Sequence, residues 1–171
     1  MRRIGATALL LVAGAMPAIS ADIPPRKAGL WELKVIMQNT GGAGMTFQQC
    51  LDAETDQLTM SSAGPLAQEA CPKHEVQRAG DTITIDSTCA VGGKPATSHV
   101  VITGSLDSAY TMTMAAESDA VPGGKMNVTT TGKYLGACTA DQKPGDMILG
   151  NGIKMNILEM KKLQQGAPRQ P

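Results

Sequence analysis

Residues 71–89 read CPKHEVQRAGDTITIDSTC, and this stretch has the pattern of a β-hairpin between two cysteines. Two segments of strand-like composition, 74–78 and 82–86, flank residues 79–81, which have the sequence Ala-Gly-Asp. A short connection containing glycine between two such segments is typical of a three-residue hairpin loop. The pattern therefore predicts two antiparallel neighbouring strands at this point of the chain.

The register of this predicted hairpin selects a disulfide pairing. A three-residue loop places Arg78 opposite Thr82, and the same register places Cys71 opposite Cys89. Directly opposed residues hold their Cβ atoms about 4.5–5.5 Å apart, which modest twist brings within reach of a disulfide. We therefore expect a bond between these two cysteines.

The other two cysteines, Cys50 and Cys138, then form the second expected disulfide. The four cysteines are widely spaced and include no C-x-x-C pair, so their spacing fits neither a zinc site nor a redox motif. An even set of this kind in an exported chain usually forms structural disulfides.

Strand signals continue on both sides of the hairpin and predict the fold class. Trp31, Leu33 and Val35 alternate with polar residues, and Tyr110, Met112, Met114 and Ala116 share one face of a later segment. The opposite faces carry Thr, Lys and Asn, which is typical of an antiparallel sheet with one wet side. We expect a mainly β protein with a single curved antiparallel meander sheet of six to eight strands. The expected strands lie near 31–37, 45–50, 73–78, 82–89, 97–104, 109–117 and 125–135.

Two helices complete the expected fold. Asp52 is a plausible N-cap for a short helix that follows the second strand and extends to about Met60. After residue 138, apolar residues recur at helical spacing and predict an amphipathic helix near 152–165, with Asn151 as its cap. We expect this C-terminal helix to lie on the sheet or across its open end.

The first residues predict export. Arg2 and Arg3 precede an uncharged apolar segment, 4–15, and small residues follow as far as Ala21. This layout is typical of a secretory signal peptide, and the apolar run is shorter than the roughly 20 residues of a membrane span. We expect residues 1–21 to be a signal peptide, and the protein to be periplasmic and not membrane-spanning after cleavage.

The remaining chain is expected to form one domain. Residues 22–138 form the disulfide-bearing β domain, and 139–171 form a loop, helix and tail packed on it.

Several motifs along this domain resemble one known family. The chain has G-L-W-E at Gly29–Glu32, the four-cysteine pattern, and G-K-Y-L-G-A-C at Gly132–Cys138. In this order they resemble the bacterial exported family called domain of unknown function 3617, over about residues 27–138. The resemblance implies a periplasmic, disulfide-bearing β protein and assigns no catalytic residue.

The composition argues against nucleic-acid binding. The chain has 15 basic and 15 acidic side chains, and only one Trp, two Tyr and one Phe. A balanced charge with so few rings offers neither a basic patch nor a stacking surface.

The strongest candidate site combines sulfur and imidazole. A tight turn at Leu106-Asp107 places His99 opposite Met114, so that His99, Met112 and Met114 share one face. Thioethers and imidazole are ligands for Cu(I), which makes these residues a candidate metal site. The alternative, which we favour, is that the methionines pack the core in place of aromatic residues.

No motif indicates an enzyme or a cofactor. G-x-S-x-G, H-E-x-x-H and glycine-rich phosphate loops are all missing. Asp52, Glu54 and Asp56 fit a solvated helix face near a helix N-terminus. We therefore expect a non-enzymatic binding or envelope-associated module without a cofactor. The sequence does not identify its partner; the candidates are an envelope protein and a small apolar ligand, and the alternative functions are Cu(I) binding and hydrophobic-ligand transport.

Overall fold

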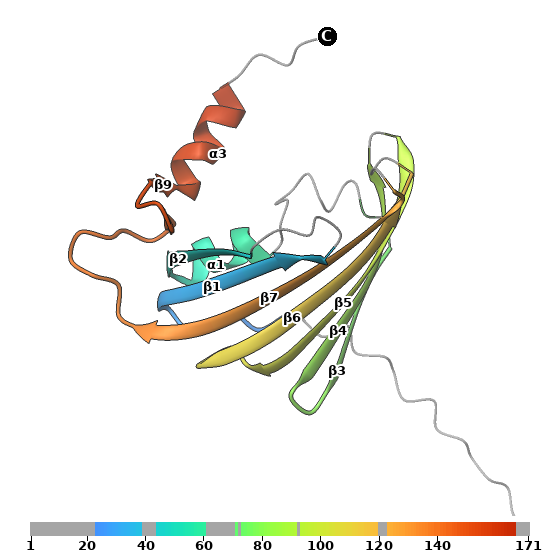
Figure 1. Ribbon diagram of the computed structural model, residues 1–171, viewed down its shortest axis with the longest axis horizontal. Helices are drawn as coiled ribbons and strands as arrows, with labels where there is room; N and C mark the ends of the chain where they lie inside the picture. The colour runs from blue at the N-terminus through green and yellow to red at the C-terminus, as the bar shows by residue number, and fades with distance from the viewer. Residues whose placement is uncertain are drawn as a thin grey trace, which may run out of the picture.

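The computed structural model describes residues 23–38, 44–60, 71, 73–91, 93–119 and 123–166 and contains one nine-stranded sheet with two helices (Figure 1). The expected signal peptide, residues 1–21, lies outside this described part. In chain order the elements are β1 (Gly29–Met37), β2 (Met45–Leu51), α1 (Ala53–Met60), β3 (Lys73–Ala79), β4 (Thr82–Val91), β5 (Lys94–Ser105), β6 (Ala109–Ser118), β7 (Lys125–Gly136), β8 (Asp146–Leu149), β9 (Lys154–Asn156) and α3 (Ile157–Gly166).

The strands lie in the order β3-β4-β5-β6-β7-β1-β2-β8-β9, and every pair is antiparallel. The first five form a meander, and the N-terminal hairpin β1–β2 then lies beside β7. The expected mainly β fold, with a short helix after the second strand and a C-terminal helix, is confirmed. The sheet has nine strands rather than six to eight because β8 and β9 extend it beyond β2.

Strand alternation divides the sheet into two faces. We call the face that packs against α1 the helix face, and the other the open face. The helix face carries the apolar set, and the open face carries mainly Thr, Lys and Glu. The buried strand residues of the helix face are Trp31, Leu33, Val76, Ile83, Ile85, Ile102 and Tyr110.

Trp31 lies at the centre of the helix face and is fully buried, as its place in the alternation predicted. Its ring centroid lies 5.7 Å from that of Tyr110 and 5.5 Å from that of Tyr134. The indole N–H donates to the carbonyl oxygen of Lys27 at 2.8 Å, so its one polar group is satisfied. Gly132 lies beneath the Tyr110 ring, where a Cβ would come within 2.2 Å of Cε1.

Helix α1 is fixed at its start and along its buried side. Asp52 is its N-cap, since Oδ1 accepts the backbone N–H of Thr55 at 2.9 Å. One turn later Asp56 is buried, and its carboxylate pairs with the Arg26 guanidinium at 2.6 Å. The expectation of a solvated face was therefore wrong for Asp56, because Arg26 lies far away in sequence and supplies the counter-charge.

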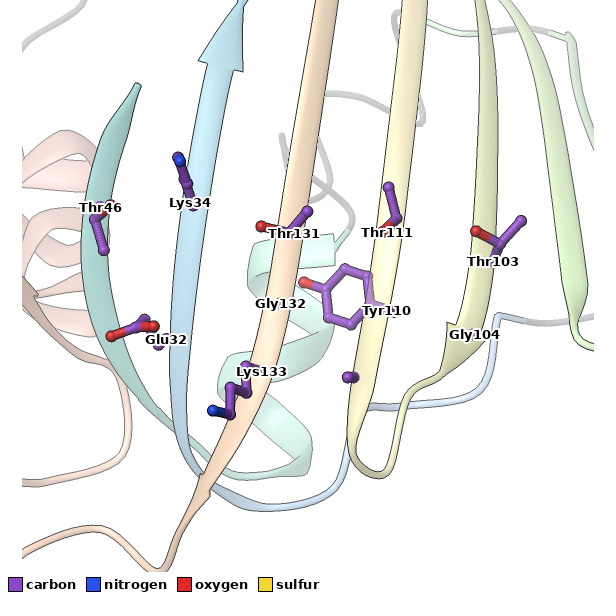
Figure 2. Close-up of a pocket in the computed structure, with 11 residues that line it drawn as sticks. Glu32, Lys34, Thr46, Thr103, Gly104, Tyr110, Thr111, Thr131, Gly132 and Lys133 are labelled. Atoms are coloured by element: carbon purple, nitrogen blue, oxygen red, sulfur yellow. The ribbon is translucent and has the colours of Figure 1, made fainter. Parts of the chain in front are cut away.

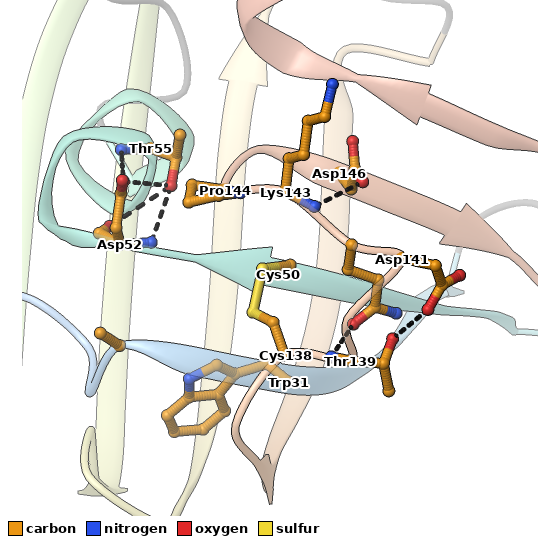
Figure 3. Close-up of a disulfide and its surroundings, with 12 residues drawn as sticks. Trp31, Cys50, Asp52, Thr55, Cys138, Thr139, Asp141, Lys143, Pro144 and Asp146 are labelled. Atoms are coloured by element: carbon orange, nitrogen blue, oxygen red, sulfur yellow. Dashed lines mark hydrogen bonds between the residues drawn. A yellow bond between two sulfur atoms is a disulfide. The ribbon is translucent and has the colours of Figure 1, made fainter.

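Two disulfides link Cys50 to Cys138 and Cys71 to Cys89, which are the expected pairs. The first joins the end of β2 to the segment that follows β7, beside the N-cap of α1 (Figure 3). It therefore ties together the two strands on either side of β1.

The register of the β3–β4 hairpin differs from the expected one by one residue. Ala79 pairs with Thr82, so the turn contains only Gly80 and Asp81 instead of residues 79–81. Gly80 has a φ of 59°, the left-handed conformation that a two-residue turn between twisted strands requires at its first position. The expected opposition of the cysteines was wrong, yet Cys71 still bonds to Cys89 because it precedes β3 and is not held in the ladder.

The C-terminal region differs from the expected single helix. Residues 147–149 pair with β2, and Lys154–Asn156 returns beside β8, so α3 begins at Ile157 rather than near 152. Asn156, not Asn151, accepts the backbone N–H of Leu158 at the start of this helix. In Figure 1 α3 extends away from the sheet instead of lying on it, and its Leu163 is 75% exposed. Neither helix of the described residues is long and apolar enough to cross a bilayer.

The contact between Gly132 and Tyr110 gives a first prediction. Gly132→Ala places a methyl group inside the space of the tyrosine ring and forces the ring to shift. We expect the free energy of unfolding to fall by about 1–3 kcal/mol, the usual cost of an overpacked core. Denaturant unfolding followed by Trp31 fluorescence measures this loss. In a Tyr110→Ala background the same substitution should cost much less, and an equal cost would contradict the assigned contact.

A second prediction concerns Asp146 at the start of β8. Burial alone raises the pKa of this carboxyl, but hydrogen bonds from Asn156 and the Lys143 backbone and the Lys154 ammonium outweigh burial, so the pKa is lowered from its usual 3.8. A pKa that is lower in the folded state stabilises the fold above about pH 3.8, and this contribution disappears as the pH falls further. Asp146→Asn should therefore be less stable than the wild type at pH 7, and the difference should shrink as the pH falls below about 3.8. A constant difference across this range, measured by denaturant unfolding, would contradict the assignment.

Candidate functional site

The open face has a hollow of about 580 Å³ at its centre, which we call the first groove (Figure 2). It extends across β2, β1, β7, β6 and β5, and α1 lies behind the strands in this view. Its lining residues include three with charged side chains and four threonines. These are Glu32, Lys34, Lys133, Thr46, Thr103, Thr111 and Thr131.

Strand register explains why these side chains lie together. Lys34 pairs with Thr46 on one side and with Thr131 on the other, and that row continues through Thr111 to Thr103. Directly paired residues of antiparallel strands project from the same face. Five residues that are distant in sequence therefore form one row across five strands.

The side chains that line the first groove carry a net positive charge. Lys34 and Lys133 each add an ammonium group, and Glu32 adds one carboxylate directly opposite Lys133. Among the described residues, the ion pairs include neither of these ammonium groups, and both lysines are exposed. The neighbouring threonine hydroxyls both donate and accept hydrogen bonds. The groove can thus bind an anionic group and several hydroxyl or amide groups at once.

A second groove of about 800 Å³ lies further along the open face, over β3 to β6. Its lining includes His99 and Asp86, whose Nδ1 and Oδ1 lie 2.7 Å apart with side chains 55% and 52% exposed. Glu117 lines the same groove and pairs with Lys125 at 2.9 Å. In contrast to the first groove, these carboxylates already have cationic or imidazole partners.

The expected site of His99, Met112 and Met114 is not assembled. His99 pairs with Ala115 and lies on the open face, whereas Met114 pairs with Val100 on the helix face. A shift of one residue moves every side chain of a strand to the opposite face. The prediction that these three residues share a face was therefore wrong.

The wrong prediction results from the loop between β5 and β6. Ser105 pairs with Ala109, so the loop has three residues instead of the tight turn expected at Leu106-Asp107. Leu106 packs against the core, and its carbonyl oxygen accepts the N–H of Lys27 at 2.9 Å. The Ser105 hydroxyl accepts the N–H of Asp107 at 3.2 Å. These contacts favour the longer loop.

Met112 and Met114 instead contribute to the helix face. Met112 packs against the core cluster, and Met114 is half-buried in the row of Val100 and Val128. Among the described residues, no group of three or more His, Cys, Asp or Glu side chains is placed to hold a metal ion.

Buried polar groups on the helix face were missed by sequence reasoning. Tyr110 lies in the core with its hydroxyl bonded to Arg26 at 3.0 Å, and burial raises the pKa of this phenol despite the nearby cation. Asp52, which the sequence predicted as the N-cap of α1, has a lowered pKa because the backbone and the hydroxyl of Thr55 donate to its carboxylate. The available signal for the buried groups was Arg26, a charged residue three positions before the family-like opening at Gly29.

The chain was compared with protein families, curated proteins and solved structures. The family described as "Protein of unknown function (DUF3617)" matches residues 26–138, which include β1 to β7 and both disulfides. No curated protein and no solved structure matches the chain. The family match covers most of the chain, and its range includes Gly29–Glu32 and Gly132–Cys138. The chain therefore belongs to the DUF3617 family.

Proposed function

We propose that this protein is a non-enzymatic module of the bacterial envelope, exported to the periplasm, that binds an anionic, hydroxyl-bearing ligand on the open face of its sheet. The observation that carries the proposal is the first groove, where Lys34 and Lys133 flank a row of threonine hydroxyls. The periplasm holds saccharides and peptides with carboxylate groups, and fragments of peptidoglycan combine both features in one molecule.

A binding role fits the division of the sheet into an apolar helix face and a polar open face. The helix face is occupied by its own side chains around Trp31 and Tyr110, which contact each other in the core. Both grooves lie on the polar face, so we favour a polar ligand over the hydrophobic ligand considered from sequence.

A non-enzymatic role fits the chemistry around the His99–Asp86 pair. Ser87 and Ser98, the serines next to this pair in sequence, project from the opposite face and bond to each other at 2.7 Å. The hydroxyls of these two serines are therefore directed to the other face of the strands from the imidazole, and its carboxylate partner is half-exposed.

Periplasmic export fits the signal-peptide layout and the two disulfides, which persist in oxidising compartments. When the full chain is expressed in a Gram-negative host, we expect a periplasmic protein whose intact mass matches residues 22–171 with both disulfides formed. Retention of Met1 in a membrane fraction, or reduced cysteines in the exported protein, would contradict export by this route.

The binding proposal is tested by titrating the purified mature protein with soluble disaccharide-peptide fragments of peptidoglycan, followed by calorimetry and by amide chemical shifts. We expect saturable binding with shifts centred on Thr111, Thr131 and Lys133, and weaker binding at higher salt. Lys34→Ala combined with Lys133→Ala should weaken binding at least tenfold, because each hydrogen bond to a charged group contributes about 1.5–3 kcal/mol.

Two controls separate groove binding from general charge attraction. Lys94→Ala removes an exposed lysine of β5 outside both grooves and should leave the affinity unchanged. A neutral oligosaccharide of similar size should bind more weakly than the acidic fragments. Equal losses in the Lys94 and groove variants, or no binding of the acidic fragments, would refute the proposal.

A further inference from the structure

A guanidinium group is buried on the helix face, away from both grooves. The side chains of Arg26 and Asp56 are each 2% exposed. Arg26 Nε donates to Asp56 Oδ1 at 2.6 Å, Nη1 donates to the Tyr110 hydroxyl at 3.0 Å, and Nη2 donates to the Thr59 hydroxyl at 2.8 Å. The guanidinium carbon also lies 6.0 Å from the Trp31 ring centroid and 5.9 Å from that of Tyr110. Every nitrogen of the guanidinium therefore has a partner.

The walls of this pocket belong to elements that also have contacts of their own besides those with Arg26. Asp56 and Thr59 lie on α1, whose N-terminus is capped by Asp52. Tyr110 lies on β6 and packs on Gly132 of β7. The Cys50–Cys138 disulfide holds the strand before α1 to the segment after β7. The N-cap, the Gly132–Tyr110 contact and the disulfide thus position the walls of the pocket together with the segment that fills it.

The segment that fills the pocket is held as a bound peptide would be. Residues 23–27 precede β1 and belong to no strand. Their backbone contacts are the Arg26 N–H donating to Asp56 Oδ2 at 2.8 Å, the Lys27 N–H donating to the Leu106 carbonyl, and the Lys27 carbonyl accepting the Trp31 indole. Pro24 and Pro25 restrict this arm to extended conformations.

The pocket is selective for guanidinium by its geometry. Three acceptors surround a planar group with donors at fixed angles, and the rings of Trp31 and Tyr110 flank it. An ammonium ion is a compact charge without this fork, so it cannot reach all three acceptors from one position. The Asp56 carboxylate requires a cationic partner, because an unpaired charge in this buried position is strongly destabilising.

We propose that Asp56, Thr59, Tyr110 and Trp31 form a guanidinium-binding site, occupied in cis by Arg26, whose ligand is the arginine side chain of an extended peptide. The arm of residues 23–27 is in this view an intramolecular ligand. The site lies on the helix face and the first groove on the open face, with Tyr110 bordering both, and the site does not rest on the function proposed above.

The test uses the full mature chain with Arg26→Ala, which empties the guanidinium position, and N-ethylguanidinium as the probe. We expect a saturable response of Trp31 fluorescence, which reports directly on one wall because the chain has a single tryptophan. At ten times its dissociation constant the probe should raise the Tm of the variant by about 3–6 °C. If the variant is unfolded without the probe, the same titration should restore the folded fluorescence.

Matched controls identify the site. Ethylammonium at equal concentration should produce no saturable response, because it lacks the planar fork. The wild type should not respond, because Arg26 fills the pocket, and Arg26→Ala with Asp56→Asn should not respond, because the carboxylate is gone. The absence of a saturable response in Arg26→Ala, an equal response to ethylammonium, or a response retained in the double variant would overturn the proposal.

Discussion

The packing of Trp31 between Tyr110 and Tyr134 is the contact around which the rest of the domain is organised. These three rings come from β1, β6 and β7, and they make up most of the few aromatic side chains in the chain. Because Trp31 is fully buried, it fixes which face of β1 turns inward. Through the ladders, that choice sets the orientation of every neighbouring strand. Helix α1 then covers the same face, and the buried pair of Arg26 and Asp56 joins the helix to the rings.

The two faces of the sheet consequently have different roles. The helix face carries the contacts that stabilise the fold, together with a buried cationic group whose hydrogen bonds are all satisfied. The open face carries threonines and charged residues, several of which line the first groove. Threonine is well suited to such a face, since its branched side chain favours strands and its hydroxyl remains available. A ligand on this face therefore need not disturb the core.

The sequence predicts the faces of the strands better than it predicts their pairing. Alternation identifies Trp31 and Tyr110 as core residues, and the cysteines are paired as expected. The loop lengths of two hairpins are each wrong by one residue, in opposite directions. The observed loop lengths depend on Gly80 adopting a left-handed conformation in the β3–β4 hairpin and on Leu106 packing against the core in the β5–β6 hairpin. Local sequence carries no information about the Leu106 contact. The candidate metal site depended on that loop and fails with it.

The elements after Cys138 were missed for a related reason. Residues 147–149 form an apolar run without alternation, and β9 has only three residues, so neither has a strand signal of its own. Pairing with β2 and the interactions of Asp146 with Lys154 and Asn156 provide what the local pattern lacks. Asp56 likewise looks like a solvated carboxylate until the fold brings Arg26 to it.

The short β9 strand limits how readily the edge of the sheet can pair with a strand from another chain. A sheet of this size ends in two rows of unpaired backbone groups, which can recruit a strand from another chain and start aggregation. On one side that row is only three residues long. On the other side β3 presents Lys73, Glu75 and Arg78, and charges on an edge oppose pairing with a second copy. Shortness on one side and charge on the other therefore both oppose edge-to-edge pairing of this sheet with another strand.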